Sequence, residues 1–207
     1  MIRTYAFSLI ALVSFSVLAI LVYLGINEPS SDIIDLDYQL FKTLNDVPQS
    51  EAFKYLMVWL SSYGREVVWS ITIAIFLIFG KSGSRKLALI LSLAILVLIP
   101  LGILTKEIIH RPRPLTLNFD SFPSGHTLIV AAGATVLLSL FNKSNKQIAI
   151  SIALAIEAAL VSISRIYVGA HYPLDVLGGV LLGVGVALFF VGSKKYFEQF
   201  YHSHINR

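Results

Sequence analysis

Cysteine is absent from this chain of 207 residues. That absence excludes a disulfide framework and any metal site built on thiolate ligands. Charged residues are also few, since they make up 14% of the chain, against about 25% in soluble domains. Once the apolar segments are counted, the chain has no room for a second domain of ordinary size.

Apolar residues are abundant, at 56% of the chain, and they form runs long enough to cross a bilayer. We therefore predict an all-α integral membrane protein, a single domain over residues 1–207 built as a six-transmembrane helical bundle. The predicted spans are residues 5–26, a stretch within 53–79, and residues 87–109, 126–141, 147–164 and 174–191. The first run is longer than the core of a cleaved signal peptide, so we interpret it as a retained helix. Gly64 interrupts the second run, whose helix is expected to begin before that residue.

A polar and acidic segment, residues 27–50, separates the first two predicted spans. Its apolar residues recur at helical spacing: Ile33, Ile34, Leu36, Leu40, Phe41 and Leu44. A short amphipathic helix on the membrane surface would explain this pattern. A packed surface loop explains it equally well, and the sequence leaves both readings open.

The basic residues are concentrated in one set of predicted loops and termini. In this set Glu198 is the only acid, and the basic residues are Arg3, Lys81, Arg85, Lys86, Lys143, Lys146, Lys194, Lys195 and Arg207. The positive-inside tendency places the set in the cytoplasm. We therefore predict a cell-membrane protein with both termini cytoplasmic. The net charge of +4 reflects this topology, and we expect no nucleic-acid partner.

Ionisable residues gather between the last two predicted spans, in residues 164–175, where charge at the edge of a bilayer indicates function. Pro173 suits the first turn of a helix, which would place Asp175 about two residues inside it. From there the carboxylate can reach back to His171, fix its tautomer and leave the other ring nitrogen free to attack. Arg165 adds a planar set of donors suited to phosphate oxygens.

Two further segments are predicted on the same outer face, so that three helix ends can converge on one pocket. Lys106 and Arg113 bring positive charges after the third span, and the fourth begins with Ser124, Gly125 and His126. Backbone N–H groups at a helix start bind anions, and glycine allows the backbone to approach closely. His126 is placed to give a proton to a departing oxygen. Two histidines, a nucleophile and a general acid, fit a double-displacement hydrolysis of a phosphate ester.

These segments resemble the three signatures of the type 2 phosphatidic acid phosphatases, also called lipid phosphate phosphatases. The matching residues are Lys106 with Arg113-Pro114, then Pro123-Ser124-Gly125-His126, then Ser164-Arg165 with His171 and Asp175. The resemblance implies that His171 is the nucleophile and forms a phosphohistidine, that Asp175 orients it and that His126 is the general acid. The phosphate ligands that it implies are Lys106, Arg113, Ser124, Gly125 and Arg165. It also implies hydrolysis without a metal or another cofactor.

Within this family the chain is most similar to the compact bacterial phosphatidylglycerophosphatase B type. Members of that type act on phosphatidylglycerophosphate, on undecaprenyl pyrophosphate or on both, and the sequence leaves the choice of lipid and the oligomeric state open. The alternative is a non-enzymatic six-helix lipid transporter or scramblase, which would not need two histidines and a carboxylate beside three cations. A haloperoxidase-like activity with bound vanadate does not suit a membrane setting.

Three charged residues outside the motif positions receive separate interpretations. Arg111 is interpreted as surface charge, with binding of a second phosphate or a head group as the alternative. Asp120 is interpreted as a loop residue. Glu157 falls midway along an apolar span, where its carboxyl could support a basic pocket residue or lie protonated against a neighbouring helix.

Overall fold

The computed structural model describes residues 2–28, 30–46 and 50–194. Every regular element within these ranges is a helix, which confirms the predicted all-α class. In chain order the elements are α1 (Ile2–Ile26), α2 (Asp32–Asn45), α3 (Glu51–Trp59), η1 (Leu60–Val68), α4 (Trp69–Ile78), α5 (Ser82–Ile109), α6 (Gly125–Leu140), α7 (Asn145–Tyr167) and α8 (Pro173–Gly192). Lys195, Glu198 and Arg207, on which the predicted cytoplasmic C-terminus partly depends, lie outside the described residues.

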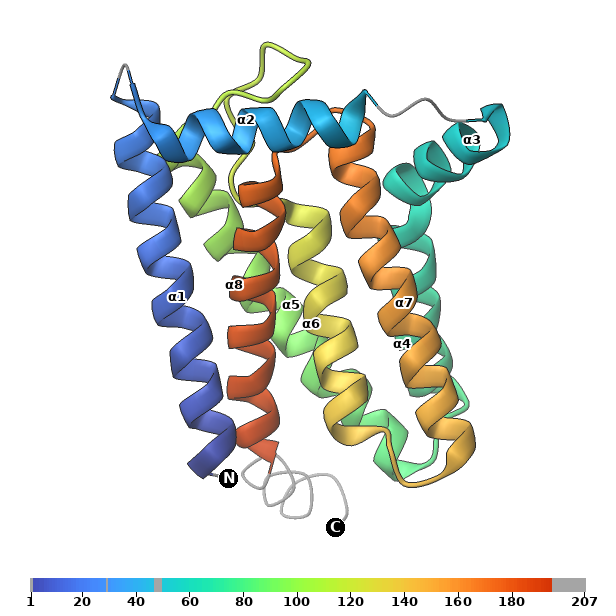
Figure 1. Ribbon diagram of the computed structural model, residues 1–207. Coiled ribbons are helices and arrows are strands. Elements are labelled where there is room, and N and C mark those ends of the chain that lie inside the picture. The colour runs from blue at the N-terminus through green and yellow to red at the C-terminus, as the bar shows by residue number, and fades with distance from the viewer. Residues whose placement is uncertain (1, 29, 47–49, 195–207) are drawn as a thin grey trace.

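The helix α8 lies between α1 and α6 and packs extensively against both (Figure 1). The helix α7 packs on the far side of α6, and α5 crosses behind α6 and α8 and contacts both (Figure 1). The start of α1 and the α4–α5 and α6–α7 connections lie at one end of the bundle, which we call the lysine end because Lys81, Lys86 and Lys143 are found there. The helix α2, residues 110–124 and the α7–α8 connection lie at the opposite end, called the motif end below (Figure 1).

Among the described residues, four helices are long and apolar enough to cross a membrane, namely α1, α5, α7 and α8. The apolar helices α4 and α6 have 10 and 16 residues, fewer than the roughly 20 that a spanning helix needs. Before α4 the chain forms α3 and then the wide π-type turns of η1 around Gly64, so helix does begin before that glycine, as predicted. The count of six spans stays a prediction.

A helix forms in the segment for which the sequence left helix and loop open. The helix α2 lies across the motif end (Figure 1) and exposes Leu36 and Leu40, while Phe41 and Asp37 are buried. At its last residue, the Asn45 side-chain amide donates to the Tyr167 carbonyl at the end of α7, at 2.7 Å. The helix is thus tied to the bundle, and its place at a membrane surface stays a prediction.

Small residues bring α8 into close contact with its neighbours. A Cβ atom at Gly183 would lie 2.3 Å from the Leu128 carbonyl oxygen on α6, and one at Gly179 would lie 2.7 Å from the Ser124 carbonyl oxygen. Towards α1, the buried Ser8 hydroxyl donates to the Gly185 carbonyl at 2.7 Å. Small residues let helix backbones approach one another inside a membrane. This packing fixes α8, and with it the side chain of Asp175 in its first turn.

Candidate active site

The connection between α7 and α8 has the local structure that the sequence predicts. Gly169 takes a left-handed conformation, with φ at 72°, and turns the chain after α7. Pro173 is the first residue of α8, and the Asp175 carboxylate accepts a hydrogen bond from the Tyr172 backbone N–H at 2.8 Å. The carboxylate does reach back across the helix start. His171, one residue earlier, is 1% exposed.

The Asp175 carboxylate lies on the Nδ1 side of the His171 ring, and Ser121 contacts both groups. The Nδ1 atom of His171 lies 3.7 Å from Asp175 Oδ2, beyond hydrogen-bonding distance. The Ser121 hydroxyl donates to the same Oδ2 at 2.5 Å and lies 3.5 Å from His171 Nδ1. Asp175 Oδ2 therefore accepts bonds from Ser121 and from the Tyr172 N–H, and the hydroxyl lies beside the contact between the ring and the carboxylate. Sequence reasoning did not identify Ser121.

The surroundings of His171 favour the neutral form of its ring. Burial lowers its pKa from the ordinary value of 6.5, against the opposing effect of Asp175. Lys106 and Arg165 are near enough to disfavour a positive charge on the ring as well. Because Nδ1 faces Ser121 and Asp175, Nε2 is the nitrogen left for a substrate.

The interpretation of Arg111 as surface charge is wrong. Its side chain is 2% exposed, and its guanidinium pairs with Asp175 Oδ1 at 2.7 Å and with Asp37 Oδ2 at 2.6 Å. Burial disfavours its charge, but Asp175 and Asp37 more than offset this effect and raise its pKa. With both terminal nitrogens bound to carboxylates, Arg111 does not act as a phosphate ligand either. Sequence reasoning did not identify Asp37 either, although it precedes the apolar Phe41 by one helical turn, on the face of α2 that is buried.

The loop residue Asp120 has a role that its loop position did not reveal. Arg113 donates from Nε and from a terminal nitrogen to its two carboxylate oxygens, at 2.7 and 2.8 Å. These hydrogen bonds hold the pKa of the Asp120 carboxyl below its usual range. Lys106 Nζ donates to the backbone carbonyl of the same residue. Without substrate, both predicted phosphate ligands of this segment are therefore engaged by Asp120.

Arg165 reaches the site from the end of α7. One terminal nitrogen donates to the Ser61 carbonyl of η1 at 2.9 Å and also to the Ser61 hydroxyl. Its buried Nε has no partner among the described residues. An unpaired buried donor on a cation is costly unless a ligand satisfies it.

The start of α6 joins these groups. The Ser124 backbone N–H donates to the Asp175 carbonyl at 2.9 Å, and its hydroxyl accepts from Thr127 at 3.1 Å. Gly125 and His126 follow as the first residues of α6, both half-buried. Arg165, His171 and Arg113 lie near enough to act on His126 electrostatically. The predicted site residues therefore meet at the motif end.

Glu157 lies against a neighbouring helix, which is one part of its second interpretation. Its Oε2 accepts a hydrogen bond from the Trp69 indole on α4 at 2.9 Å, whereas Oε1 has no partner within the described ranges. The Trp69 ring lies against Gly133, where a Cβ atom would come within 1.9 Å of it. The Glu157 carboxyl thus forms a hydrogen bond that links α7 to the neighbouring α4.

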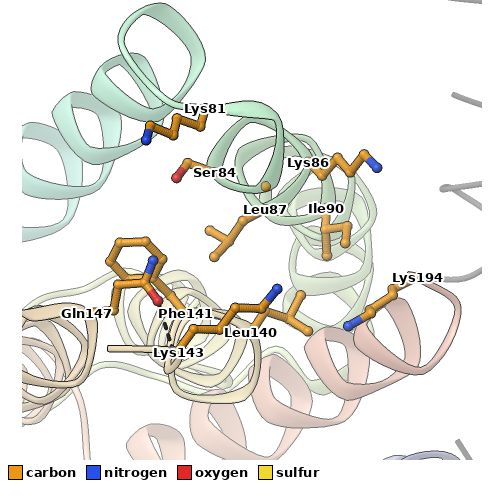
Figure 2. Close-up of a pocket in the computed structure, with 11 residues that line it drawn as sticks. Lys81, Ser84, Lys86, Leu87, Ile90, Leu140, Phe141, Lys143, Gln147 and Lys194 are labelled. Carbon is orange, nitrogen blue, oxygen red and sulfur yellow. Dashed lines mark hydrogen bonds between the residues drawn. The ribbon is translucent and has the colours of Figure 1, made fainter. Parts of the chain in front are cut away.

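A separate hollow of about 240 Å³ opens at the lysine end, far from these residues (Figure 2). Its lining includes Lys81, Lys86, Lys143 and Lys194, and among the described residues it contains no histidine or carboxylate. It therefore lacks the pair of histidines and the carboxylate that the motif end brings together. Across residues 2–28, 30–46 and 50–194, no group of three metal-binding side chains is found either. The candidate active site is the group of residues at the motif end.

Comparison with known proteins defines the class. The sequence model of the PAP2 superfamily matches residues 85–198, which make up more than half of the chain. The chain belongs to the PAP2 superfamily.

Individual relatives agree with this assignment. An undecaprenyl-diphosphatase from Sulfolobus acidocaldarius is 39% identical over 184 residues, which cover 80% of this chain and 84% of that protein. Phosphatidylglycerophosphatase B from Bacillus subtilis is 38% identical over 98 residues, 42% of this chain and 46% of that protein. The crystal structure of a PAP2-type phosphatidylglycerolphosphate phosphatase from Bacillus subtilis superimposes with a TM-score of 0.69 at 25% identity, covering 93% of this chain and 96% of that one. The crystal structure of LpxE from Aquifex aeolicus superimposes with a TM-score of 0.62 at 29% identity, covering 76% of this chain and 95% of that one.

Proposed function

We propose that this protein is a membrane phosphatase that hydrolyses undecaprenyl pyrophosphate, phosphatidylglycerophosphate or both through a phosphohistidine. The observation that carries the proposal is the buried His171, which has Ser121 and Asp175 on its Nδ1 side and cations nearby. The names of two relatives supply the two lipids. The relative named for the diphosphate matches over more of this chain, which favours the pyrophosphate.

The phosphate group of the lipid binds among Lys106, Arg113 and Arg165, with Ser124 and the backbone around Gly125 as further donors. The unpaired Nε of Arg165 is available to a phosphate oxygen. To bind with both donors of its fork, Arg113 releases Asp120. Fixed cations then meet the charge that develops in the transition state, which is the task of a metal in other phosphatases.

In the first step the lone pair on His171 Nε2 attacks phosphorus, and the bond from phosphorus to the leaving oxygen breaks. His126 donates a proton to that oxygen. The negative charge of the bound phosphate favours the imidazolium form of His126, which otherwise faces several cations. Asp175 and Ser121 hold the Nδ1 side of His171 and stabilise the positive charge that the ring acquires.

In the second step water attacks the phosphorus of the phosphohistidine and gives its proton to His126. The nitrogen–phosphorus bond breaks, its electron pair returns to His171, and inorganic phosphate leaves. The cycle restores both histidines to their starting states. No step requires a metal or another cofactor.

In the membrane, residues 1–207 form one domain with six spans, in which α3, η1 and α4 together make the second and α6 the fourth. Both termini and the lysine end face the cytoplasm, in accordance with the positive-inside tendency. The motif end faces outward, and α2 lies in the outer interface. A substrate head group then reaches the site from the outer leaflet.

The deciding experiment is a turnover assay of the purified protein on phosphatidylglycerophosphate, phosphatidic acid and undecaprenyl pyrophosphate, side by side. A soluble aryl phosphate is included because a transporter or scramblase would not hydrolyse it. Release of phosphate from the aryl ester and from at least one lipid is expected. No release from any of the four would overturn the proposal and favour lipid transport.

A further inference from the structure

A line of buried charges links α2 to the start of α8. Asp37, Arg111 and Asp175 are 1%, 2% and 0% exposed, and the guanidinium gives one terminal nitrogen to each carboxylate. Burying three charges costs several kcal/mol per ion, and well-packed apolar residues of the same volume are often equally stabilising or more so. Packing alone does not explain this triad.

The triad holds the first turn of α8 from two sides. Asp37 Oδ1 accepts the Leu174 backbone N–H at 2.9 Å, and Asp175 Oδ2 accepts the Tyr172 N–H at 2.8 Å. The Arg111 guanidinium lies 4.3 Å above the centre of the Tyr172 ring. With Oδ1 of Asp175 bound to Arg111, its Oδ2 is directed to Ser121 and to the Nδ1 side of His171.

We infer that Arg111 and Asp37 are positioning residues, which act through Asp175 to hold the His171 imidazole in the orientation for attack. The helix α2 is thereby part of the active site, although Asp37 lies outside the residues that the family model matches. The inference rests on the proposed function.

The geometry separates positioning from substrate binding. Both terminal nitrogens of Arg111 are bound to carboxylates, and a carboxylate such as Asp37 repels a phosphate, whose charge has the same sign. A lipid phosphate therefore makes no contact with either residue, and their loss should leave substrate affinity intact. A misoriented nucleophile lowers the rate of the chemical step, because displacement by about 1 Å can cost roughly a hundredfold.

The test compares Asp37→Asn with Asp35→Asn, an identical change at an exposed position of the same helix. Each purified variant is assayed for kcat and KM on an aryl phosphate, and its thermal unfolding is recorded. In Asp37→Asn we expect kcat to fall by roughly ten- to a hundredfold with KM unchanged. Asp35→Asn should behave as the unsubstituted protein, and Asp37→Glu should recover part of the lost kcat.

A second variant tests the same inference in case Asp37→Asn does not fold. Arg111→Lys keeps the charge but lacks the planar fork that bridges two carboxylates, so kcat should fall with KM unchanged. An unaltered kcat, or a raised KM at unaltered kcat, in the folded variants would overturn the inference. Failure of both variants to fold would also overturn it, because the triad would then be a requirement of folding. Absence of activity in the unsubstituted protein would count against the proposed function instead.

Discussion

The pair between Arg113 and Asp120 leads to a prediction with a definite sign. In the absence of substrate the carboxylate takes both donors of the guanidinium fork, at 2.7 and 2.8 Å. A phosphate that binds the fork must displace it. The variant Asp120→Ala removes the competing side chain and retains the backbone carbonyl that Lys106 contacts. We expect this variant to bind phosphate more tightly than the unsubstituted protein.

The exposure of the pair limits the size of the effect. The Asp120 side chain is 47% exposed and that of Arg113 is 19% exposed, and such pairs are worth at most about 1 kcal/mol. That free energy corresponds to a change in affinity of up to about fivefold. The dissociation constant for vanadate or inorganic phosphate should therefore fall by about two- to fivefold in Asp120→Ala.

The assay is competitive inhibition of aryl phosphate hydrolysis by vanadate, at low and at high salt. The advantage of the variant should shrink as salt rises, because screening weakens an exposed pair. Glu107→Ala is the matched control, since it removes an exposed carboxylate next to Lys106. Weaker inhibition of Asp120→Ala than of the unsubstituted protein would refute the reasoning and show that Asp120 aims Arg113 at the substrate.

Four other predictions follow from the site. His171→Ala should form no base-stable phosphoenzyme with any labelled substrate. His126→Ala should regain part of its phosphoenzyme on an activated aryl ester, whose leaving group needs less protonation. Phosphoenzyme formed by His171→Ala and absent from His126→Ala would reverse the two roles. Asp175→Asn should lower kcat strongly but incompletely, because the imidazole keeps its place while its developing charge loses support; full activity in this variant would contradict the assignment. Activity should survive a chelator and be inhibited by vanadate, and loss in the chelator with recovery in magnesium would count against metal-free hydrolysis. Because burial lowers the pKa of His171 below 6.5, its neutral form persists as pH falls below that value, so the acidic limb of kcat/KM on an aryl phosphate should lie below pH 6.5 and not above it.

The sequence was sufficient to predict the local features of this protein. Runs of apolar residues predicted helices, because a buried helix must be apolar over its length. Pro173 and Asp175 predicted the start of α8, since both suit the first turn of a helix. The order of three motifs predicted that Lys106, His126 and His171 would meet, because helix ends on one side of a bundle lie close together.

Contacts between distant segments were beyond reach of the same reasoning. Arg111 lies in a polar, proline-rich stretch and gives no local sign of burial, because both its partners are far from it in sequence. Ser121 is one of many serines, and only the fold brings its hydroxyl close to both His171 and Asp175. Glu157 was recognised as unusual by its depth, but its partner Trp69 could not be chosen before the helices were placed.

The close packing of α8 bears on how a lipid reaches the nucleophile. A helix whose glycines touch the backbone of α6 and whose carbonyl is held by Ser8 of α1 has little freedom to slide or to turn about its axis. The depth of His171 is therefore constant, and the lipid must travel to a stationary site. We expect the motion that admits it in elements other than α8. Since the chain lacks cysteine, single labels can follow that motion with α8 as the fixed frame of reference.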